Sequence, residues 1–326
     1  MAAGSLEEQL VKYLTDAHSI EEQALAQMRS APDLAEDQRL ATALKEHEAE
    51  TERHERLVRE RLEAHDAKPS RLKDAVMAVG GKGFVLFARS QPDTDGKLAT
   101  HAISYEHLEL ASYELLMRVA RRAGDTETAD VARAIRDEER AMAERLEASF
   151  DGTVDASLEQ HPRDDLDKLV DKYLGDAHAI EAQAEQLLSK APSIGGDDAE
   201  LARLYEEHLE ETREHKRLVE ERLEARGSSP SRLQDAAMRL GALNWGGFFA
   251  AQPDTPGKLL AFAYAFEHLE IGGYEHLKRV ADRAGDAETA ALAERILAEE
   301  RAASQRFAAN WDRALEASLA ALGHPA

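Results

Sequence analysis

Acidic and histidine side chains recur three or four residues apart in this sequence, which is the spacing of one face of a helix. The segment EHEAETERH contains His47, Glu50 and His54, and the segment SYEHLELASYE contains Glu106 and Glu109. Side chains at these intervals lie close together on a helix surface. Because carboxylate oxygens and imidazole nitrogens suit iron and manganese, the pattern predicts a metal site formed by several helices.

These motifs occur twice along the chain. EHEAETERH from Glu46 returns as EHLEETREH from Glu207, an offset of 161 residues (207 − 46), and the segment from Ser104 returns from Ala265. The sequence therefore predicts two copies of one unit, each long enough to form a domain with its own core. We expect domain 1 at residues 5–150, a linker at 151–164, domain 2 at 165–315 and a C-terminal tail at 316–326.

Both copies place acidic residues inside the apolar stripes of their predicted helices. These acids match between the copies although neighbouring positions differ: the pairs are Glu21 and Glu181, Glu50 and Glu211, Glu106 and Glu267, Glu109 and Glu270, Glu138 and Glu299, and Glu139 and Glu300. A buried, unpaired carboxylate costs roughly several kcal/mol, so a cation should compensate for the charge. The alternative for each single Glu is a solvated surface position, which is where most helical Glu residues lie.

The histidines differ in how strongly they indicate metal binding. His54 and His215 each follow a matched Glu by four residues, which favours them as ligands. The roles of His18, His47, His178 and His208 stay open between helix packing, capping and metal binding.

Composition limits the partners of the chain. The formal net charge of −23 disfavours nucleic acid and anionic membranes and favours metal cations. The absence of cysteine excludes disulfides and cysteine-ligated metal sites. Charged residues near the start replace the apolar core of a secretory signal, and no stretch has the roughly 18 to 20 apolar residues that span a bilayer. We expect a cytoplasmic protein without nucleic-acid or membrane partners.

Helical periodicity extends over four stretches of the first copy. They run from Leu10 to Met28, from about Leu40 to Leu62, from about Leu98 to Val119 and from about Thr128 to Phe150. Residues 68–96 form a long connection that should hold a short helix capped by Ser70, and the second copy repeats it around Ser231. A long crossover lets the third helix run parallel to the second. We therefore predict an all-α chain of two tandem ferritin-like four-helix bundles.

At this point the residues resemble the YciE/YciF stress-response proteins, part of the ferritin-like four-helix dinuclear-metal superfamily. The resemblance rests on His47-x-x-Glu50-Thr51-x-x-His54 and Glu106-His-x-Glu109-x-x-x-Tyr113, repeated from His208 and Glu267, and covers nearly all of each copy. It implies a tandem fusion with two iron or manganese ions per domain. The implied ligand candidates are Glu21, Glu50, His54, Glu106, Glu109 and Glu138 or Glu139, and in the second copy Glu181, Glu211, His215, Glu267, Glu270 and Glu299 or Glu300.

The leading hypothesis is a dinuclear iron or manganese protein that gives protection from oxidative stress, either by reacting with peroxide or dioxygen or by oxidising ferrous ion. We predict no catalytic residue beyond the metal ligands. The alternative is a non-catalytic metal-binding or structural stress protein, so turnover stays open. A covalent tandem favours an internal pseudo-dimer over a storage cage, and a further homo-oligomer stays open as well.

Overall fold

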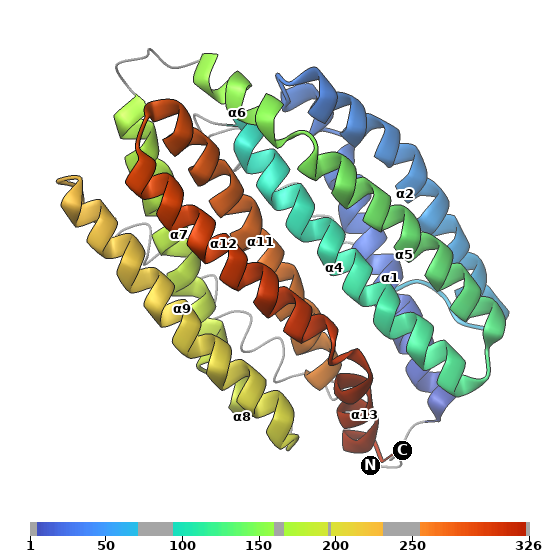
Figure 1. Cartoon of the computed structure of the whole chain (residues 1–326). Helices are drawn as coiled ribbons and strands as arrows, with labels where there is room; N and C mark the ends of the chain where they lie inside the picture. The colour runs from blue at the N-terminus through green and yellow to red at the C-terminus, as the bar shows by residue number, and fades with distance from the viewer. Residues whose placement is uncertain (1–4, 71–93, 160–165, 195–196, 231–254, 324–326) are drawn as a thin grey trace. The chain divides into compact units, whose positions relative to one another are not determined.

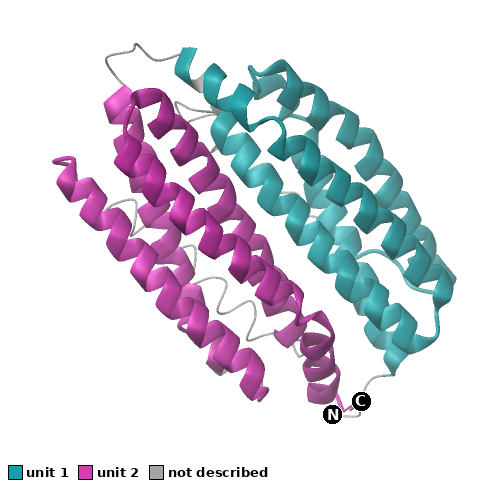
Figure 2. Ribbon diagram, in the orientation of Figure 1, with its two compact units in different colours: residues 1–160 teal, residues 161–326 magenta. Residues whose placement is uncertain are grey.

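The computed structural model describes residues 5–70, 94–159, 166–194, 197–230 and 255–323. Within these ranges every regular element is a helix (Figure 1). The chain divides into two compact units, Met1–Gln160 and His161–Ala326 (Figure 2). The prediction of an all-α chain with two tandem helical units is therefore confirmed.

Unit 1 is built from four long helices, α1 (Leu6–Met28), α2 (Gln38–Ala64), α4 (Thr94–Ala123) and α5 (Thr126–Glu147). The short 3-10 helix η1 (Pro32–Leu34) links α1 to α2, and α6 (Phe150–Glu159) follows α5. Helix α1 contacts α2 and α4, and α5 contacts α4 and α2. Each long helix thus has two long neighbours, and the four inner faces meet along a common axis.

Contacts between α2 and α5 show that these helices are antiparallel. Residue numbers rise along α2 as they fall along α5: Glu50 bonds to Arg145, His54 to Glu138, and Arg61 to Asp125. Since the two-residue link between α4 and α5 also makes an antiparallel pair, α2 and α4 run in the same direction. This agrees with a long crossover between them. The short helix expected within that crossover, and its copy near Ser231, lie outside the described residues.

Side chains at the helix starts explain where the helices begin. Ser5 and Glu8 form a capping box at the start of α1. Asp37 accepts a hydrogen bond from the Leu40 amide, and Asp125 accepts one from the Thr128 amide. An N-cap of this kind satisfies a backbone donor that the helix leaves unpaired. The helices that carry the candidate ligands therefore begin at positions fixed by local sequence.

Unit 2 repeats this arrangement with α7 (Leu166–Leu188), α9 (Ala199–Ala225), α11 (Thr255–Ala284) and α12 (Ala287–Ala308). The short helix α8 (Ala191–Ile194) lies between α7 and α9, and α13 (Trp311–Ala321) follows α12. The contacts pair α7 with α9 and α11, and α12 with α11 and α9. The four long helices of unit 2 thus have the same neighbours as their counterparts in unit 1.

Two helices occupy segments that we expected to be the linker and the tail. Helix α6 includes residues 151–159 of the expected linker and contacts α4 and α2 of its own unit. Helix α13 extends into the expected tail at residues 316–326 and contacts α11. The exact domain limits stay predictions.

An apolar cluster fills the end of unit 1 where α1 ends and α2 and α4 begin. It includes Met28, Leu44, Leu98, Met142 and Leu146, all almost fully buried. Going further along α2 and α4, the inward positions change from apolar side chains to Glu and His. No helix in the described ranges is long and apolar enough to cross a membrane.

Candidate metal centre

Four buried side chains meet in the middle of unit 1, and we call them the His47 group: His47, Glu106, Glu109 and Glu139. Each offers one ligand atom, and these atoms lie within 4.8 Å of one another. His47 Nε2 is 3.3 Å from Glu106 Oε2 and 3.2 Å from Glu139 Oε2. All four residues are 0% exposed, so the group is closed off from bulk water.

A second cluster, the His54 group, contains Glu21, His54 and Glu139, again with ligand atoms within 4.8 Å of one another. His54 Nδ1 lies 2.7 Å from Glu139 Oε1 and 4.0 Å from Glu21 Oε1. Glu139 therefore belongs to both groups. Its Oε2 faces His47 and its Oε1 faces His54, which is the arrangement of a carboxylate that bridges two cations.

Most of the polar atoms that these groups turn toward one another lack a hydrogen-bond partner among the described residues, which tests whether a cation would fit. Among the described residues, neither carboxylate oxygen of Glu106, Glu109 or Glu139 has one, and neither does His47 Nε2 or His54 Nδ1. The short contacts above bring these atoms close without hydrogen-bond geometry. A buried polar atom left in this state costs about 1–3 kcal/mol. Iron or manganese fits this donor set of carboxylates with one imidazole per group.

Burial changes the protonation of the carboxyl groups. It raises the pKa of Glu21 to about 8, helped by the nearby charge of Glu139. It also raises the pKa of Glu106 to about 7, although His47 opposes the shift. The pKa of Glu109 is raised well above its ordinary value by burial and by the charge of Glu139. Without a cation, part of the negative charge is therefore removed by protons.

Contacts between His54 and Glu139 favour the charged form of both side chains. Burial lowers the pKa of His54, but contacts with Glu139 and Glu21 outweigh it and raise this pKa to about 9. Burial raises the pKa of Glu139, but the adjacent His47 and His54 outweigh it and hold this pKa below its ordinary value. The metal-free centre thus pairs imidazolium with carboxylate, and a metal ion would have to displace these protons.

Glu50 and Glu138, two sequence-derived ligand candidates, lie outside both groups. Glu50 accepts a hydrogen bond from His47 Nδ1 at 2.9 Å and pairs with Arg145 at 2.5 Å, and its side chain is 27% exposed. The hydrogen bond from His47 lowers the pKa of Glu50 to about 2. Glu138 is 43% exposed and contacts His54 Nε2 at 2.6 Å. Each carboxylate therefore orients a histidine from the side that faces away from the cluster.

Unit 2 contains the same two groups. His208, Glu267, Glu270 and Glu300 form one, and Glu181, His215 and Glu300 form the other. His215 Nδ1 is 2.8 Å from Glu300 Oε1, and His208 Nε2 is 2.9 Å from Glu267 Oε1. The outer carboxylates are also in equivalent places: Glu211 contacts His208 Nδ1 at 3.0 Å, and Glu299 contacts His215 Nε2 at 2.8 Å.

In each unit, a buried tyrosine contacts the glutamate that α1 or its counterpart α7 contributes. Tyr113 donates a hydrogen bond to Glu21 Oε1, and Tyr274 donates one to Glu181 Oε1 at 2.6 Å. Both tyrosines are 1% exposed. Each hydrogen bond orients one oxygen of its glutamate, and the other oxygen, Oε2, has no partner among the described residues.

His47 and His208 are two of the four histidines whose roles stay open from the sequence. A signal for them was present, because His47 follows Leu40 and Leu44 at helical intervals and so shares their inward stripe. Glu50 lies three residues after His47 and four before His54, and this intermediate position directs it toward α5 and Arg145. His107, by contrast, contacts the backbone oxygen of Ile103 at 2.7 Å, which is a packing role.

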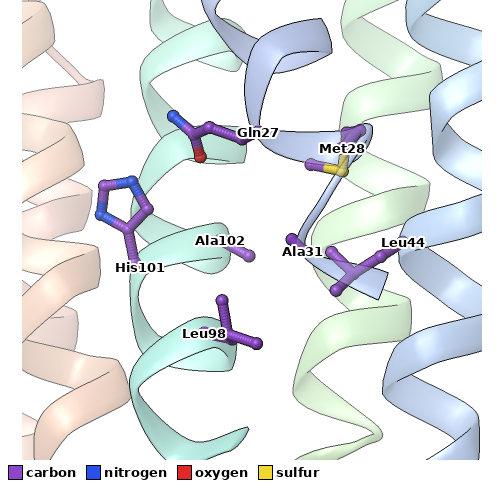
Figure 3. Close-up of a pocket in the computed structure, with 7 residues that line it drawn as sticks. All are labelled: Gln27, Met28, Ala31, Leu44, Leu98, His101 and Ala102. Carbon is purple, nitrogen blue, oxygen red and sulfur yellow. The ribbon is translucent and has the colours of Figure 1, made fainter. Parts of the chain in front are cut away.

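A small pocket lies in the apolar end of unit 1, between α1, α2 and α4 (Figure 3). Leu44, Leu98, His101 and Ala102 line it together with Gln27, Met28 and Ala31. The volume open to the centre of a water molecule is about 10 Å³, which is room for roughly one water. The larger Tyr205, 1% exposed, replaces Leu44 in unit 2. This space suits a molecule of the size of water rather than an organic substrate.

Two tandem helical units, each with paired buried groups of carboxylate and imidazole, define this chain as an all-α protein with candidate metal centres. Residues 5–159 and 165–320 each match the domain of unknown function DUF892. The chain therefore belongs to the DUF892 family and carries two copies of its domain. No solved structure matches the chain.

Proposed function

We propose that each unit binds two iron or manganese ions and protects against oxidative stress by a reaction with peroxide or dioxygen, or by oxidising ferrous ion. The observation that carries this proposal is the position of Glu139, and of Glu300 in unit 2, between two buried groups. The resemblance to the ferritin-like YciE/YciF proteins supports it independently, because that resemblance implies two metal ions in each domain.

The residues that would hold the ions are those of the paired groups. His47, Glu106 and Glu109 would bind one ion, Glu21 and His54 the other, and Glu139 both. Bound iron or manganese would supply one-electron chemistry and polarise a bound oxidant. Glu50 with Arg145 holds His47 at Nδ1, which leaves Nε2 facing the cluster. Such outer hydrogen bonds fix the tautomer of a histidine ligand and raise its basicity.

A non-catalytic role in metal binding is the second candidate, and the burial of the two groups favours it. The residues of the His47 group are 0% exposed, so turnover would require an oxidant as small as peroxide or dioxygen to reach them. Both functions need the same ligands. They differ in whether the loaded protein consumes an oxidant.

Metal analysis of paired variants tests the proposal. The paired groups of the native chain should bind four ions, two in each unit. Glu139→Gln together with Glu300→Gln should lose at least half of them, because each substitution removes a ligand shared by two ions. The matched control is Glu63→Gln with Glu224→Gln, which changes exposed carboxylates of α2 and α9 outside both groups and should keep the ion count. No bound iron or manganese in the native chain would refute the proposal.

Peroxide consumption then separates the two candidate functions. The loaded native protein should consume added hydrogen peroxide or oxidise ferrous ion faster than the Glu139→Gln and Glu300→Gln variant does. If the native protein holds its full set of ions and still reacts no faster than this variant, the non-catalytic function remains.

A further inference from the structure

A third group of potential ligands lies in unit 1, outside the paired groups, and the described part of unit 2 has no counterpart of it. It contains His18, Glu22 and Glu55, whose ligand atoms lie within 4.8 Å of one another. His18 and Glu22 lie on α1, one turn apart, and Glu55 faces them from α2. We call these three residues the His18 site.

Burial and distance make the His18 site a built cluster rather than a chance surface group. His18 Nε2 lies 3.0 Å from Glu55 Oε1, and the two side chains are 4% and 10% exposed. Glu22 is half-buried, and it makes no hydrogen bond or ion pair within the part of the chain that the structure describes. An imidazole nitrogen and two carboxylates thus converge from two helices.

Charge balance leaves room for a cation at the His18 site. Arg59 contacts Glu55 Oε1 at 3.0 Å from one turn further along α2, and its side chain is 43% exposed. When His18 is neutral, as a metal ligand must be, one arginine against two carboxylates leaves one negative charge uncompensated. Because Arg59 reaches the site from the solvent side, it can move away when a cation binds.

The equivalent position in unit 2 lacks the two carboxylates. Its counterparts of His18, Glu22 and Glu55 are His178, Ala182 and Lys216. The Lys216 ammonium forms an ion pair with Glu185, which also contacts Arg213 at 3.1 Å. Where unit 1 has two carboxylates, unit 2 therefore has a covalently attached cation.

We propose that the His18 site binds one divalent first-row cation, such as Mn²⁺, Fe²⁺ or Zn²⁺, and that unit 2 lacks this site. One imidazole and two carboxylates form a borderline-hard donor set that suits these ions. Glu22 reaches toward solvent, so the ion would bind near the surface and exchange more readily than ions in the closed groups. The chain would then bind one more ion in unit 1 than in unit 2.

Equilibrium dialysis of the full chain against Mn²⁺ or Zn²⁺, followed by elemental analysis, tests the assignment. Glu22→Ala combined with Glu55→Lys copies the unit 2 residues and should lower the count by one ion per chain. The reciprocal change, Ala182→Glu with Lys216→Glu, should raise it by one. An unchanged count in both folded variants would overturn the proposal.

A milder variant covers the case in which Glu55→Lys fails to fold. Glu22→Gln changes a half-buried residue and should weaken the most readily exchanged ion about tenfold or more. Arg59→Gln should strengthen the same ion, because it removes the competing positive charge. If neither variant changes that affinity, the His18 site holds no cation.

The outcome is independent of the paired groups. Native protein that binds a single ion, lost in the Glu22→Ala and Glu55→Lys variant, would support the His18 site and refute the dinuclear centres. Four bound ions that remain in this variant would support the dinuclear centres and refute the His18 site.

Discussion

Each candidate centre combines two kinds of carboxylate at the scale of single residues. Glu106, Glu109 and Glu139 are fully buried, and their oxygens have no hydrogen-bond partner within the described ranges, so they are the ones that need a cation. Glu50 is already paired with Arg145 and His47, and its charge is balanced without a metal. The two kinds should therefore respond differently to substitution.

Substitution of His47 and Glu50 should separate these roles. We expect Glu50→Ala to weaken metal binding in unit 1 about 10–100-fold, the usual effect of removing a carboxylate that orients a histidine ligand. His47→Ala should abolish binding of one ion. Isothermal titration calorimetry measures both effects. A loss in Glu50→Ala equal to that in His47→Ala would instead make Glu50 a direct ligand.

Metal binding should release protons and strengthen as pH rises. Without metal, the pKa values of Glu106, Glu21 and His54 are about 7, 8 and 9, so these groups carry protons in neutral solution. Ligation requires their deprotonated forms. The affinity for Mn²⁺ should therefore increase between about pH 6 and 9, and a pH indicator in weak buffer should record proton release. Affinity that does not change over this range would contradict the assignment.

At the scale of elements, the helix that carries Glu138 and Glu139 is held by its N-cap. Asp125 accepts a hydrogen bond from the Thr128 amide and contacts Arg61 and His65 of α2. One carboxylate thereby caps α5 and connects it to α2. Asp286 takes the same place in unit 2, where it caps α12 and binds Arg222 and Arg226.

Loss of this cap should destabilise unit 1. Asp125→Ala should lower the free energy of unfolding by about 1–2 kcal/mol, because the helix start loses a partner and Arg61 loses an acceptor. Urea denaturation of the metal-free chain measures the change. Asp130→Ala, at an exposed position of the same helix, is the matched control and should change stability by less than about 0.5 kcal/mol. Equal effects would show that the cap is unimportant.

Helix α4 carries a second test, because Glu109 has no hydrogen-bond partner among the described residues. Glu109→Leu should stabilise the metal-free protein by about 1–3 kcal/mol, since it removes a buried polar group whose desolvation is uncompensated. The same variant should gain less stability on addition of metal. Thermal denaturation with and without Mn²⁺ measures both quantities. A variant that is less stable without metal would contradict this account.

For the whole molecule, the raised pKa values of Glu21, Glu106 and His54 predict how stability depends on pH. The folded metal-free chain binds more protons than the unfolded chain from about pH 4.5 to 9, so its stability should fall as pH rises through this window. The opposite shift of Glu139 acts below this window. Metal at 100 times its dissociation constant adds about 2.7 kcal/mol per site.

The melting temperature should reveal this linkage. We expect that of the metal-free chain to decrease from pH 6 to pH 9 and the gain from added Mn²⁺ to increase over the same range. Glu139→Gln should reduce the gain for unit 1 and leave that for unit 2. A metal-free protein that becomes more stable toward pH 9 would refute the assigned protonation states.

The sequence by itself determined the helices, the tandem repeat and the presence of inward acids. Periodicity and N-caps are local properties, so Asp37 and Asp125 fix helix starts without reference to the rest of the fold. Comparison of the two copies also distinguished the acidic residues that both copies share from those that differ between them. The acids of α1 and α4 could thus be predicted, because Glu21, Glu106 and Glu109 each lie in a clear apolar stripe.

Only the tertiary structure decided which side chains meet. Adjacent residues on a helix point about 100° apart, so a choice between Glu138 and Glu139 depends on how α5 is rotated against its neighbours. Packing turns Glu139 into both groups and leaves Glu138 43% exposed. In the same way, the rotation of α2 against its neighbours directs His47 inward and places Glu50 against Arg145. Sequence spacing defines a face of a helix, but the partners of that face come from other helices, and their contacts fix its final direction.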